Sequence, residues 1–132
     1  MFHAKDIMTK EVSTVRQDAK ITDVIRLLAQ KRITGVPVVS DDMRLLGVVT
    51  EKDILRTLRY DQNIKGKSAA DLMTSEIISF DENDSLMEVF ASLVENDFRR
   101  VPILSEGILV GIVSRRDIIE FFSAKAAESK TK

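Results

Sequence analysis

The chain consists of two copies of one segment, and this internal duplication limits the folds open to it more than any other feature. Three motifs recur in the same order 64 or 65 positions later: Asp6–Thr9 at Asp71–Thr74, Val36–Ser40 at Val101–Ser105, and Gly47–Ile54 at Gly111–Ile118. When 6–40 and 46–55 are paired with their partners, 13 of 45 positions are identical, whereas chance gives roughly one in fifteen to twenty. A unit of about 55 residues buries only about 60% of its unfolded surface alone, so we expect the copies to fold together.

Each copy has the pattern of a strand, a helix, two strands and a second helix. Apolar residues recur with helical spacing in both copies: Ile21, Val24, Ile25 and Leu28, then Leu86, Val89, Phe90 and Leu93. Short apolar runs predict the strands at 12–15, 36–39 and 45–49 in the first copy, and at 77–80, 101–104 and 109–113 in the second. A last helix is expected from Glu51 and from Arg115, and Ser85 with Glu88 fits a capping box.

These elements predict an α+β (α/β-like) fold, in which two β-α-β-β-α repeats related by an approximate two-fold axis pack into one module. The first repeat is expected at 1–60 and the second at 68–124. A polar linker at 61–67 joins them, and 125–132 is expected to be a flexible, charged tail.

The composition excludes several classes of function. The chain has no cysteine and a single histidine, His3, which excludes disulfides, thiol catalysis and histidine-based metal sites or triads. Its 20 basic and 21 acidic residues give a net charge of −1, which argues against nucleic acid as a partner. No apolar run approaches the roughly 18 residues of a membrane span, and no signal peptide is recognisable. We therefore expect a soluble, cytoplasmic protein without a membrane partner.

The most informative motif is Gly-h-h-[Thr/Ser]-x-x-Asp, where h is apolar, at 47–53 and 111–117. It places a hydroxyl and a carboxylate where a strand meets a helix N-terminus. The two side chains fit a capping box. An ionised carboxylate is also suited to accept two hydrogen bonds from the vicinal hydroxyls of a ribose, and the free amides of the helix start would favour a nearby phosphate. Acidic clusters at 41–42 and 81–84 are interpreted as turns and caps.

Each copy resembles a CBS domain in its Asp-h-Met-Thr opening, its Val-Pro strand and its Gly-h-h-[Thr/Ser]-x-x-Asp ending. Over roughly 3–122 the chain resembles a tandem pair of these domains, the Bateman module. The resemblance implies a disc-like, non-catalytic module with two clefts between the repeats that bind adenosyl ligands. The ligand is expected to be AMP, ADP or ATP, with S-adenosylmethionine or NAD as alternatives, and no catalytic cofactor is expected.

The resemblance also implies which residues form the two nucleotide sites. In the first site, Asp117 and Ser114 are expected to bind the ribose, Ile112 to line the base, and Met8 and Ser13 to close the cleft. In the second site, the matching residues are Asp53 and Thr50 for the ribose, Val48 for the base, and Met73 and Ile78 for closing the cleft. The residues before the Val-Pro strand would border base and phosphates: Ile33, Thr34 and Gly35 in the first copy, and Phe98, Arg99 and Arg100 in the second.

The two copies differ in the residues that would bind phosphate. The second has arginine pairs at 99–100 and 115–116, where the first has Thr34-Gly35 and Glu51-Lys52. Guanidinium groups match phosphate oxygens in a bidentate way, so the site around Asp117 is expected to favour anionic nucleotides, with Arg100 as the phosphate ligand. Solvated loops and helix faces remain the alternative interpretation of both pairs.

The preferred function is a regulatory sensor that acts on an unknown effector protein, and no enzyme activity is expected. The alternative is a ligand-free interaction or homodimerisation module in which the aspartates only cap helices. The resemblance favours a homodimer formed through the helices near 54–58 and 118–122; burial of Phe121 and Phe122 within the module is the competing explanation.

Overall fold

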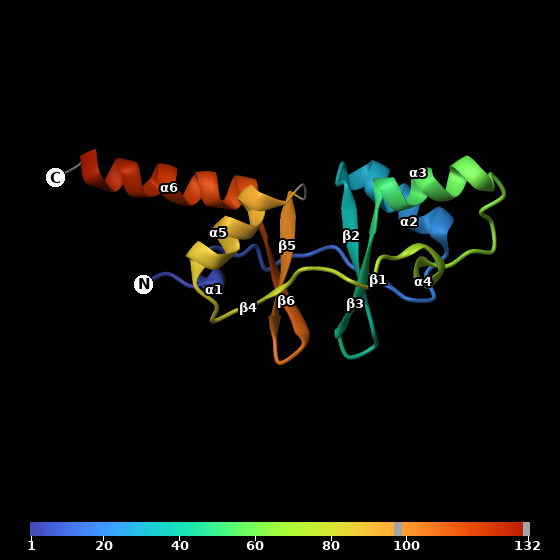
Figure 1. Ribbon diagram of the computed structural model, residues 1–132, viewed down its shortest axis with the longest axis horizontal. Coiled ribbons are helices and arrows are strands. Elements are labelled where there is room, and N and C mark those ends of the chain that lie inside the picture. Colours follow the sequence, from blue (N-terminus) through green and yellow to red (C-terminus); the bar gives the residue numbers. More distant parts are fainter. Residues whose placement is uncertain (97–98, 131–132) are drawn as a thin grey trace. The chain divides into compact units, whose positions relative to one another are not determined.

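The computed structural model describes residues 1–96 and 99–130 and contains two three-stranded sheets with helices (Figure 1). The first half holds α1 (Ala4–Ile7), β1 (Val15–Arg16), α2 (Ile21–Lys31), β2 (Gly35–Val39), β3 (Leu45–Thr50) and α3 (Glu51–Tyr60). The second half repeats this order with α4 (Ala69–Leu72), β4 (Phe80–Asp81), α5 (Leu86–Glu95), β5 (Arg100–Ser105), β6 (Ile108–Ser114) and α6 (Arg115–Lys130). The predicted α+β fold with duplicated elements is confirmed.

The two sheets have the same topology and share an irregularity. The central strand, β2 or β5, pairs in parallel with a two-residue strand and antiparallel with the strand that follows it. Both antiparallel ladders shift register at the matching step, between Val38 and Val39 and between Ile103 and Leu104. The strands β1 and β4 begin later than the sequence pattern predicts.

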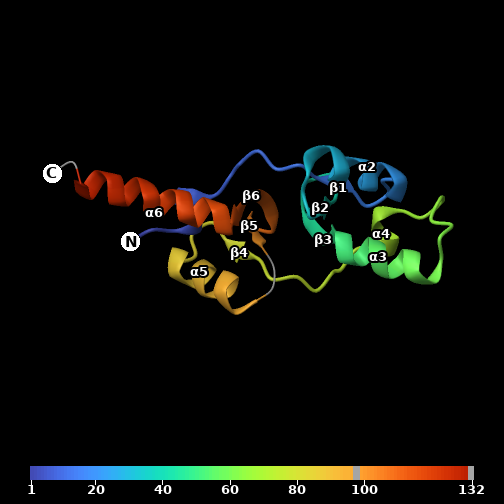
Figure 2. The same cartoon turned by 90° about the horizontal axis from the view of Figure 1, so that it is seen from above.

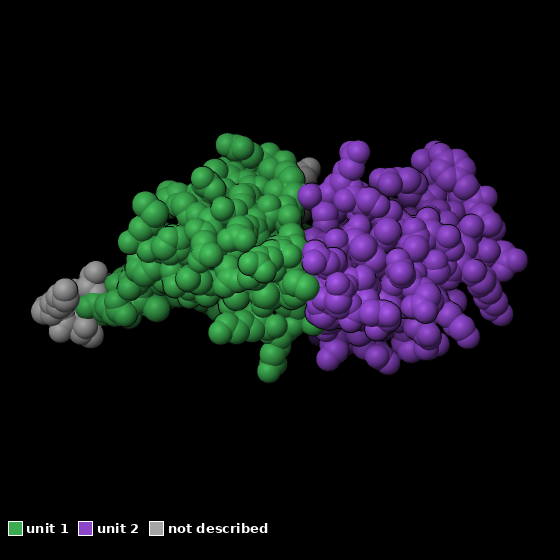
Figure 3. Space-filling view, turned by 90° about the horizontal axis from the view of Figure 1, so that it is seen from below, with its two compact units in different colours: residues 1–12, 78–132 green, residues 13–77 purple. Residues whose placement is uncertain are grey.

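The chain folds into two compact units whose boundaries differ from those of the repeats (Figure 3). One unit comprises residues 13–77, and the other comprises 1–12 together with 78–132. The opening segment of each repeat therefore belongs to the unit that holds the rest of the other repeat. Alanines from these segments, Ala4 and Ala69, are fully buried and join the cores.

Each unit packs the apolar stripe of one helix on one face of its sheet. In unit 13–77 the core residues include Ile21, Val24, Val36, Val38 and Val49, all without solvent exposure. In the other unit the matching positions are Val89, Val101, Ile103 and Val113. Burial of each such side chain stabilises a fold by about 1.5–3 kcal/mol. These core residues lie in the segments that the helical and strand periodicities of the sequence predicted.

Three local features differ from the sequence expectations. The segment 61–67 includes Ile64, which is buried in the first core, so the polar linker is anchored there. Ser85 caps α5 by accepting a bond from the Met87 amide, 3.2 Å, instead of from the third helical residue. The expected tail at 125–132 is helical as far as Lys130, where α6 ends, and residues 131 and 132 lie outside the described residues.

The long α6 has identifiable supports beyond its first turns. Both Figure 1 and Figure 2 show it continuing as one helix past the end of the sheet. The Phe2 and Phe121 rings meet edge to face with centroids 4.8 Å apart, and the Lys125 ammonium lies 4.8 Å from the Phe2 centroid. Among the described residues, the structure contains no helix that is both long and apolar enough to cross a membrane.

Candidate functional site

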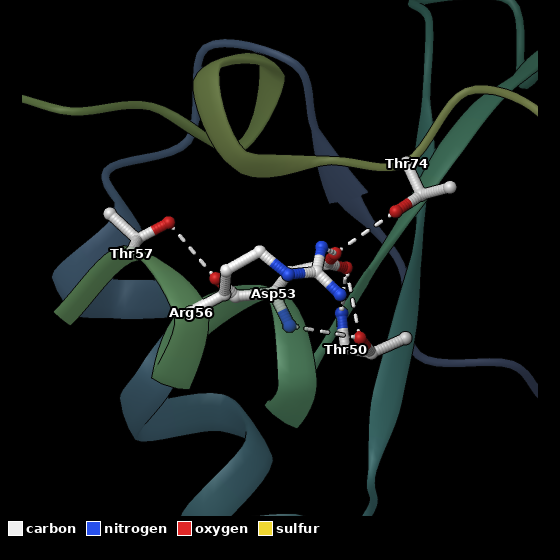
Figure 4. Close-up of polar contacts among 5 residues, drawn as sticks. All are labelled: Thr50, Asp53, Arg56, Thr57 and Thr74. Atoms are coloured by element: carbon white, nitrogen blue, oxygen red, sulfur yellow. Dashed lines mark hydrogen bonds and ion pairs between the residues drawn. The ribbon is translucent and has the colours of Figure 1, made fainter. Parts of the chain in front are cut away.

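Asp53 lies in the first turn of α3 and forms a complete capping box with Thr50, the N-cap (Figure 4). Its Oδ2 accepts the Thr50 amide at 2.8 Å and the Thr50 hydroxyl at 2.9 Å, and the Thr50 Oγ1 accepts the Asp53 amide at 3.2 Å. A cap of this kind stabilises a helix by about 1 kcal/mol. The capping interpretation of this pair is therefore realised in the structure.

Asp117 and Ser114 repeat this arrangement at the start of α6. The Asp117 Oδ2 accepts the Ser114 amide at 2.8 Å and the Ser114 hydroxyl at 2.9 Å, while the Ser114 Oγ accepts the Asp117 amide at 3.1 Å. In both units Oδ2 is thus committed to the cap. Any sugar hydroxyl would have to bind the other oxygen, Oδ1.

Each carboxylate is also contacted by a threonine from an opening segment, which was not among the predicted site residues. The Thr74 hydroxyl donates to Asp53 Oδ1 at 2.9 Å, and the Thr9 hydroxyl donates to Asp117 Oδ1 at 3.0 Å. These threonines end the repeated Asp-h-Met-Thr motif, so their recurrence was the available signal. The backbone holds them in place, because Thr74 exchanges two hydrogen bonds with Val48 and Thr9 exchanges two with Ile112.

The methionines of the same motif lie against the glycines that begin the aspartate motif. A Cβ built on Gly111 would stand 2.6 Å from the Met8 sulfur, and one built on Gly47 would stand 2.9 Å from the Met73 sulfur. The expected proximity of Met8 to the Asp117 motif, and of Met73 to the Asp53 motif, is thus present within each unit. The two motifs of the sequence are contact partners in space.

The residues before each central strand also lie beside the helix starts. The Thr34 carbonyl accepts the Glu51 amide at 2.9 Å, and the Arg99 carbonyl accepts the Arg115 amide at 3.0 Å. Because the third amide of each helix is bound by Thr50 or Ser114, two donors of each first turn are already used. The expectation of free amides for a phosphate is therefore wrong for these donors.

The four arginines of the second copy have different surroundings. The Arg115 Nη2 donates to the Asn96 carbonyl at 3.3 Å, at the end of α5, and Arg116 pairs with Glu120 at 3.0 Å. Arg99 is exposed, whereas Arg100 is half-buried opposite Ser114 in the β5–β6 ladder. Its Nε is buried and is without a hydrogen-bond partner among the described residues.

The remaining predicted residues divide between the two faces of the sheets. Val48 and Ile112 are half-buried and alternate with the core residues Val49 and Val113, which places them on the opposite face. Ile33 packs against the first core and, with Thr34, lines a hollow of about 430 Å³ between α2 and α3.

Three expected neighbours stay untested. Ser13 belongs to the unit that lacks Asp117, and Ile78 to the unit that lacks Asp53. Phe98 lies outside the described residues. Their assignment to the nucleotide sites remains a prediction.

The acidic clusters contact mainly neighbouring residues, and Asp41 also pairs with Arg16. Asp42 accepts hydrogen bonds from the Ser40 hydroxyl and from Arg44, and the Ser40 bond lowers the pKa of its carboxyl most. Asp81 and Asp84 cap the turn before α5. No cluster of three His, Cys, Asp or Glu suited to a metal ion occurs within 1–96 and 99–130.

Comparison with known proteins gives the family. The CBS domain family model matches residues 4–60 and again 69–124. Among curated proteins, the chain is 34% identical over 119 residues to hypoxic response protein 1 of Mycobacterium tuberculosis, covering 89% of this chain and 83% of that protein. It is also 32% identical over 120 residues to an uncharacterised protein of Methanocaldococcus jannaschii, MJ1225, covering 91% of this chain.

Solved structures agree with this assignment. CBSX2 in complex with AMP is 28% identical, with a TM-score of 0.80 and full coverage of both chains, and CBSX2 comes from Arabidopsis thaliana. The CBS domain pair of MJ0100, in complex with 5′-methylthioadenosine and S-adenosyl-L-methionine, is 27% identical, with a TM-score of 0.77 and coverage of 95% and 98%.

Some of the matched proteins are much longer than this chain. It spans 42% of the length of MJ1225 and 23% of homoserine O-acetyltransferase of Methanococcus vannielii. The family model matches both copies of the duplicated segment in this chain. The chain belongs to the CBS domain family and is a tandem pair of CBS domains.

Proposed function

We propose that this chain is a non-catalytic regulatory module that binds an adenosine-containing nucleotide at Asp117 and, more weakly, at Asp53. The observation that carries the proposal is the state of Asp117. Its Oδ2 is used by the cap, but its Oδ1 accepts only the exposed Thr9 hydroxyl among the described residues. An ionised carboxylate oxygen has two lone pairs, so this oxygen can accept a ribose hydroxyl.

The related structures support the same ligand class. CBSX2 was crystallised with AMP, and the MJ0100 pair with 5′-methylthioadenosine and S-adenosyl-L-methionine. All three ligands contain adenosine, whereas their 5′ substituents differ in charge and size. A carboxylate that recognises the ribose fits the part that they share. The 5′ substituent must then be discriminated by other residues, which we assign to the second copy's Arg99 and Arg100.

Arg100 is the strongest candidate for a phosphate ligand. A buried charged donor without a partner costs about 1–3 kcal/mol, and the Arg100 Nε is such a donor among the described residues. Arg100 stands opposite Ser114, next to the Asp117 cap. A phosphate that drew the guanidinium into a bidentate contact would relieve this cost. The first copy has Gly35 at the matched position.

Thermal unfolding with a ligand panel tests the proposal. Adenosine, AMP, ADP, ATP, S-adenosylmethionine and NAD are added to the wild type, to Asp117→Asn, and to Asp42→Asn as a control on the surface. A ligand at 100 times its Kd stabilises the folded state by about 2.7 kcal/mol. We expect AMP to raise the Tm of the wild type and of the control by several degrees, and to raise that of Asp117→Asn much less.

A panel in which no adenosyl compound changes the Tm of the wild type would reject the sensor function. An equal shift in Asp117→Asn would mean that a ligand binds but that this carboxylate does not hold it. The regulated effector would be another protein, and regulation requires that the ligand bind its two states unequally.

A homodimerisation module is the second candidate, and the exposed apolar side chains of α3 and α6 favour it. Leu55 is 64% exposed, Ile119 is 63% exposed and Phe122 is 47% exposed. The predicted dimer helices thus retain apolar surface, although Phe121 packs on Phe2 within its unit. Sedimentation equilibrium of the wild type, Leu55→Glu and Ile119→Glu tests whether these helices form a dimer interface. A dimeric wild type whose variants are monomeric would support the interface, and a monomeric wild type would exclude it.

A further inference from the structure

The two aspartates differ in what faces Oδ1, although their caps are alike. Asp53 is only 6% exposed, while Asp117 is half-buried. The Arg56 Nη1 lies 3.6 Å from Asp53 Oδ1, and Figure 4 shows its guanidinium beside the carboxylate. In the second copy the matched residue is Glu120, which pairs with Arg116. A cation therefore covers one carboxylate and not the other.

The two carboxylates also differ in how many of their hydrogen-bond acceptor positions are occupied. A carboxylate has about four acceptor positions. On Asp53, two are filled by Thr50 and one by Thr74, and Arg56 faces the fourth. On Asp117, two are filled by Ser114 and one by Thr9, and no other described residue donates to it.

We infer that Arg56 closes the carboxylate of Asp53, so that Asp117 keeps one acceptor position open to a sugar hydroxyl and Asp53 accepts one only when Arg56 moves away. The sugar part rests on the proposed function. Arg56 is thus a specificity-determining residue, because it lowers the affinity of the Asp53 site for the sugar relative to the Asp117 site. This effect is independent of the residues that bind phosphate. Because its side chain is 69% exposed, the closure is weak and reversible.

Two variants and one control isolate the effect. Arg56→Gln removes the cation and leaves a shorter, uncharged polar side chain. Glu120→Arg introduces a cation at the matched position of α6. Arg59→Gln is the control, because Arg59 is exposed on the same helix and contacts the Tyr60 ring, 5.7 Å from its centroid. Neutral adenosine is the ligand, so that no phosphate contact contributes.

The first measurement needs no ligand. Carboxyl groups are labelled with a water-soluble carbodiimide and glycinamide, and the labelling rates at Asp53 and Asp117 are read by mass spectrometry. We expect Asp53 to react several-fold more slowly than Asp117 in the wild type. Arg56→Gln should increase the rate at Asp53 several-fold, and Arg59→Gln should leave it unchanged. Equal rates in the wild type, or an unchanged rate at Asp53 in Arg56→Gln, would overturn the closure.

The second measurement is calorimetry with adenosine in an Asp117→Asn background, where only the Asp53 site remains. Arg56→Gln should strengthen binding about two- to fivefold, which is the range of an exposed ion pair, and Arg59→Gln should not. In the otherwise wild-type chain, Glu120→Arg should weaken binding at Asp117. Unchanged affinities in both variants would overturn the ranking. If the wild type binds no adenosyl compound, the proposed function fails, and the labelling rates alone decide whether Arg56 closes Asp53.

Discussion

Glycine at the start of each aspartate motif has a steric reason that the structure makes specific. A Cβ on Gly47 would stand 2.7 Å from the Thr74 carbonyl oxygen, a backbone atom that is fixed in a two-bond bridge with Val48. The three atoms nearest to a Cβ on Gly111 all belong to the Met8 side chain, at 2.6–3.1 Å. The two glycines hold equivalent positions, but their neighbours differ in how readily they can move.

Gly47→Ala should therefore destabilise the protein by about 1–3 kcal/mol, the usual cost of overpacking, and Gly111→Ala by less. Gly35→Ala is the control, because its nearest contacts are ordinary at 3.4 Å. Urea unfolding of the three variants measures the differences. A Gly47→Ala protein as stable as Gly35→Ala would contradict the close approach of the opening segment to β3.

Arg100 should matter only for ligands that carry phosphate. Calorimetric titration of adenosine and AMP into Arg100→Ala should show a loss of roughly tenfold or more in AMP affinity, since charge-assisted hydrogen bonds contribute about 1.5–3 kcal/mol, with adenosine nearly unaffected. Arg116→Ala is the matched control, because Arg116 is engaged by Glu120. An equal loss for adenosine and AMP would show that Arg100 does not bind phosphate.

The short helix α4 is held by a charged cap with a pH dependence of its own. The Asp71 carboxylate accepts bonds from the Ser68 amide at 2.7 Å and the Ser68 hydroxyl at 3.1 Å, and the amide bond is the main cause of its lowered pKa. A carboxyl whose pKa is lower in the folded state stabilises the fold above the unfolded value, near pH 4. This contribution is lost as the pH falls through the lower, folded value.

Asp71→Asn should thus be less stable than the wild type at pH 7, and the difference should shrink as the pH falls below about 4. Thermal unfolding of both proteins between pH 2.5 and 7 measures this. Asp23→Asn serves as a control, since Asp23 forms an ion pair with the exposed Arg26 at 2.9 Å. A difference in Tm that stayed constant over the whole range would contradict the assigned role of Asp71.

At the level of elements, the sequence predicted the repeated helices and the longer strands because their apolar residues follow the periods of helix and strand. The order of elements, the core residues such as Val24 and Val89, and both aspartate caps follow from local pattern. The contacts of Thr9 and Thr74 did not, because they join residues 108 and 21 positions apart. Spacing along the chain carries no direct signal for such pairs.

The extent of α6 was missed for a related reason. The segment after Ser123 has few apolar residues and reads as a tail, yet Phe2, from the far end of the sequence, lies against Phe121 and Lys125. Helical residues gain support from tertiary contacts that no window of local sequence contains. The same limit explains why the unequal surroundings of Arg100 and Arg115 needed the structure.

At the level of the whole molecule, the exchanged opening segments make each repeat incomplete on its own. The fragment 13–77 contains every residue of the first core, including Ala69 and Leu72, whereas the fragment 1–66 lacks both. The two fragments have nearly the same length and share most of their sequence. We expect 13–77 to unfold cooperatively on heating, followed by circular dichroism, and 1–66 to show at most a weak transition. Equal cooperativity would contradict the division into units.

A crystal structure of the protein grown with excess AMP would show whether Asp117 holds the ribose of an adenosine-containing nucleotide. We expect electron density for AMP with a ribose hydroxyl within hydrogen-bond distance of Asp117 Oδ1 and the phosphate at the Arg100 guanidinium. A structure without AMP at Asp117, in which the carboxylate keeps only its bonds to Ser114 and Thr9, would contradict this expectation.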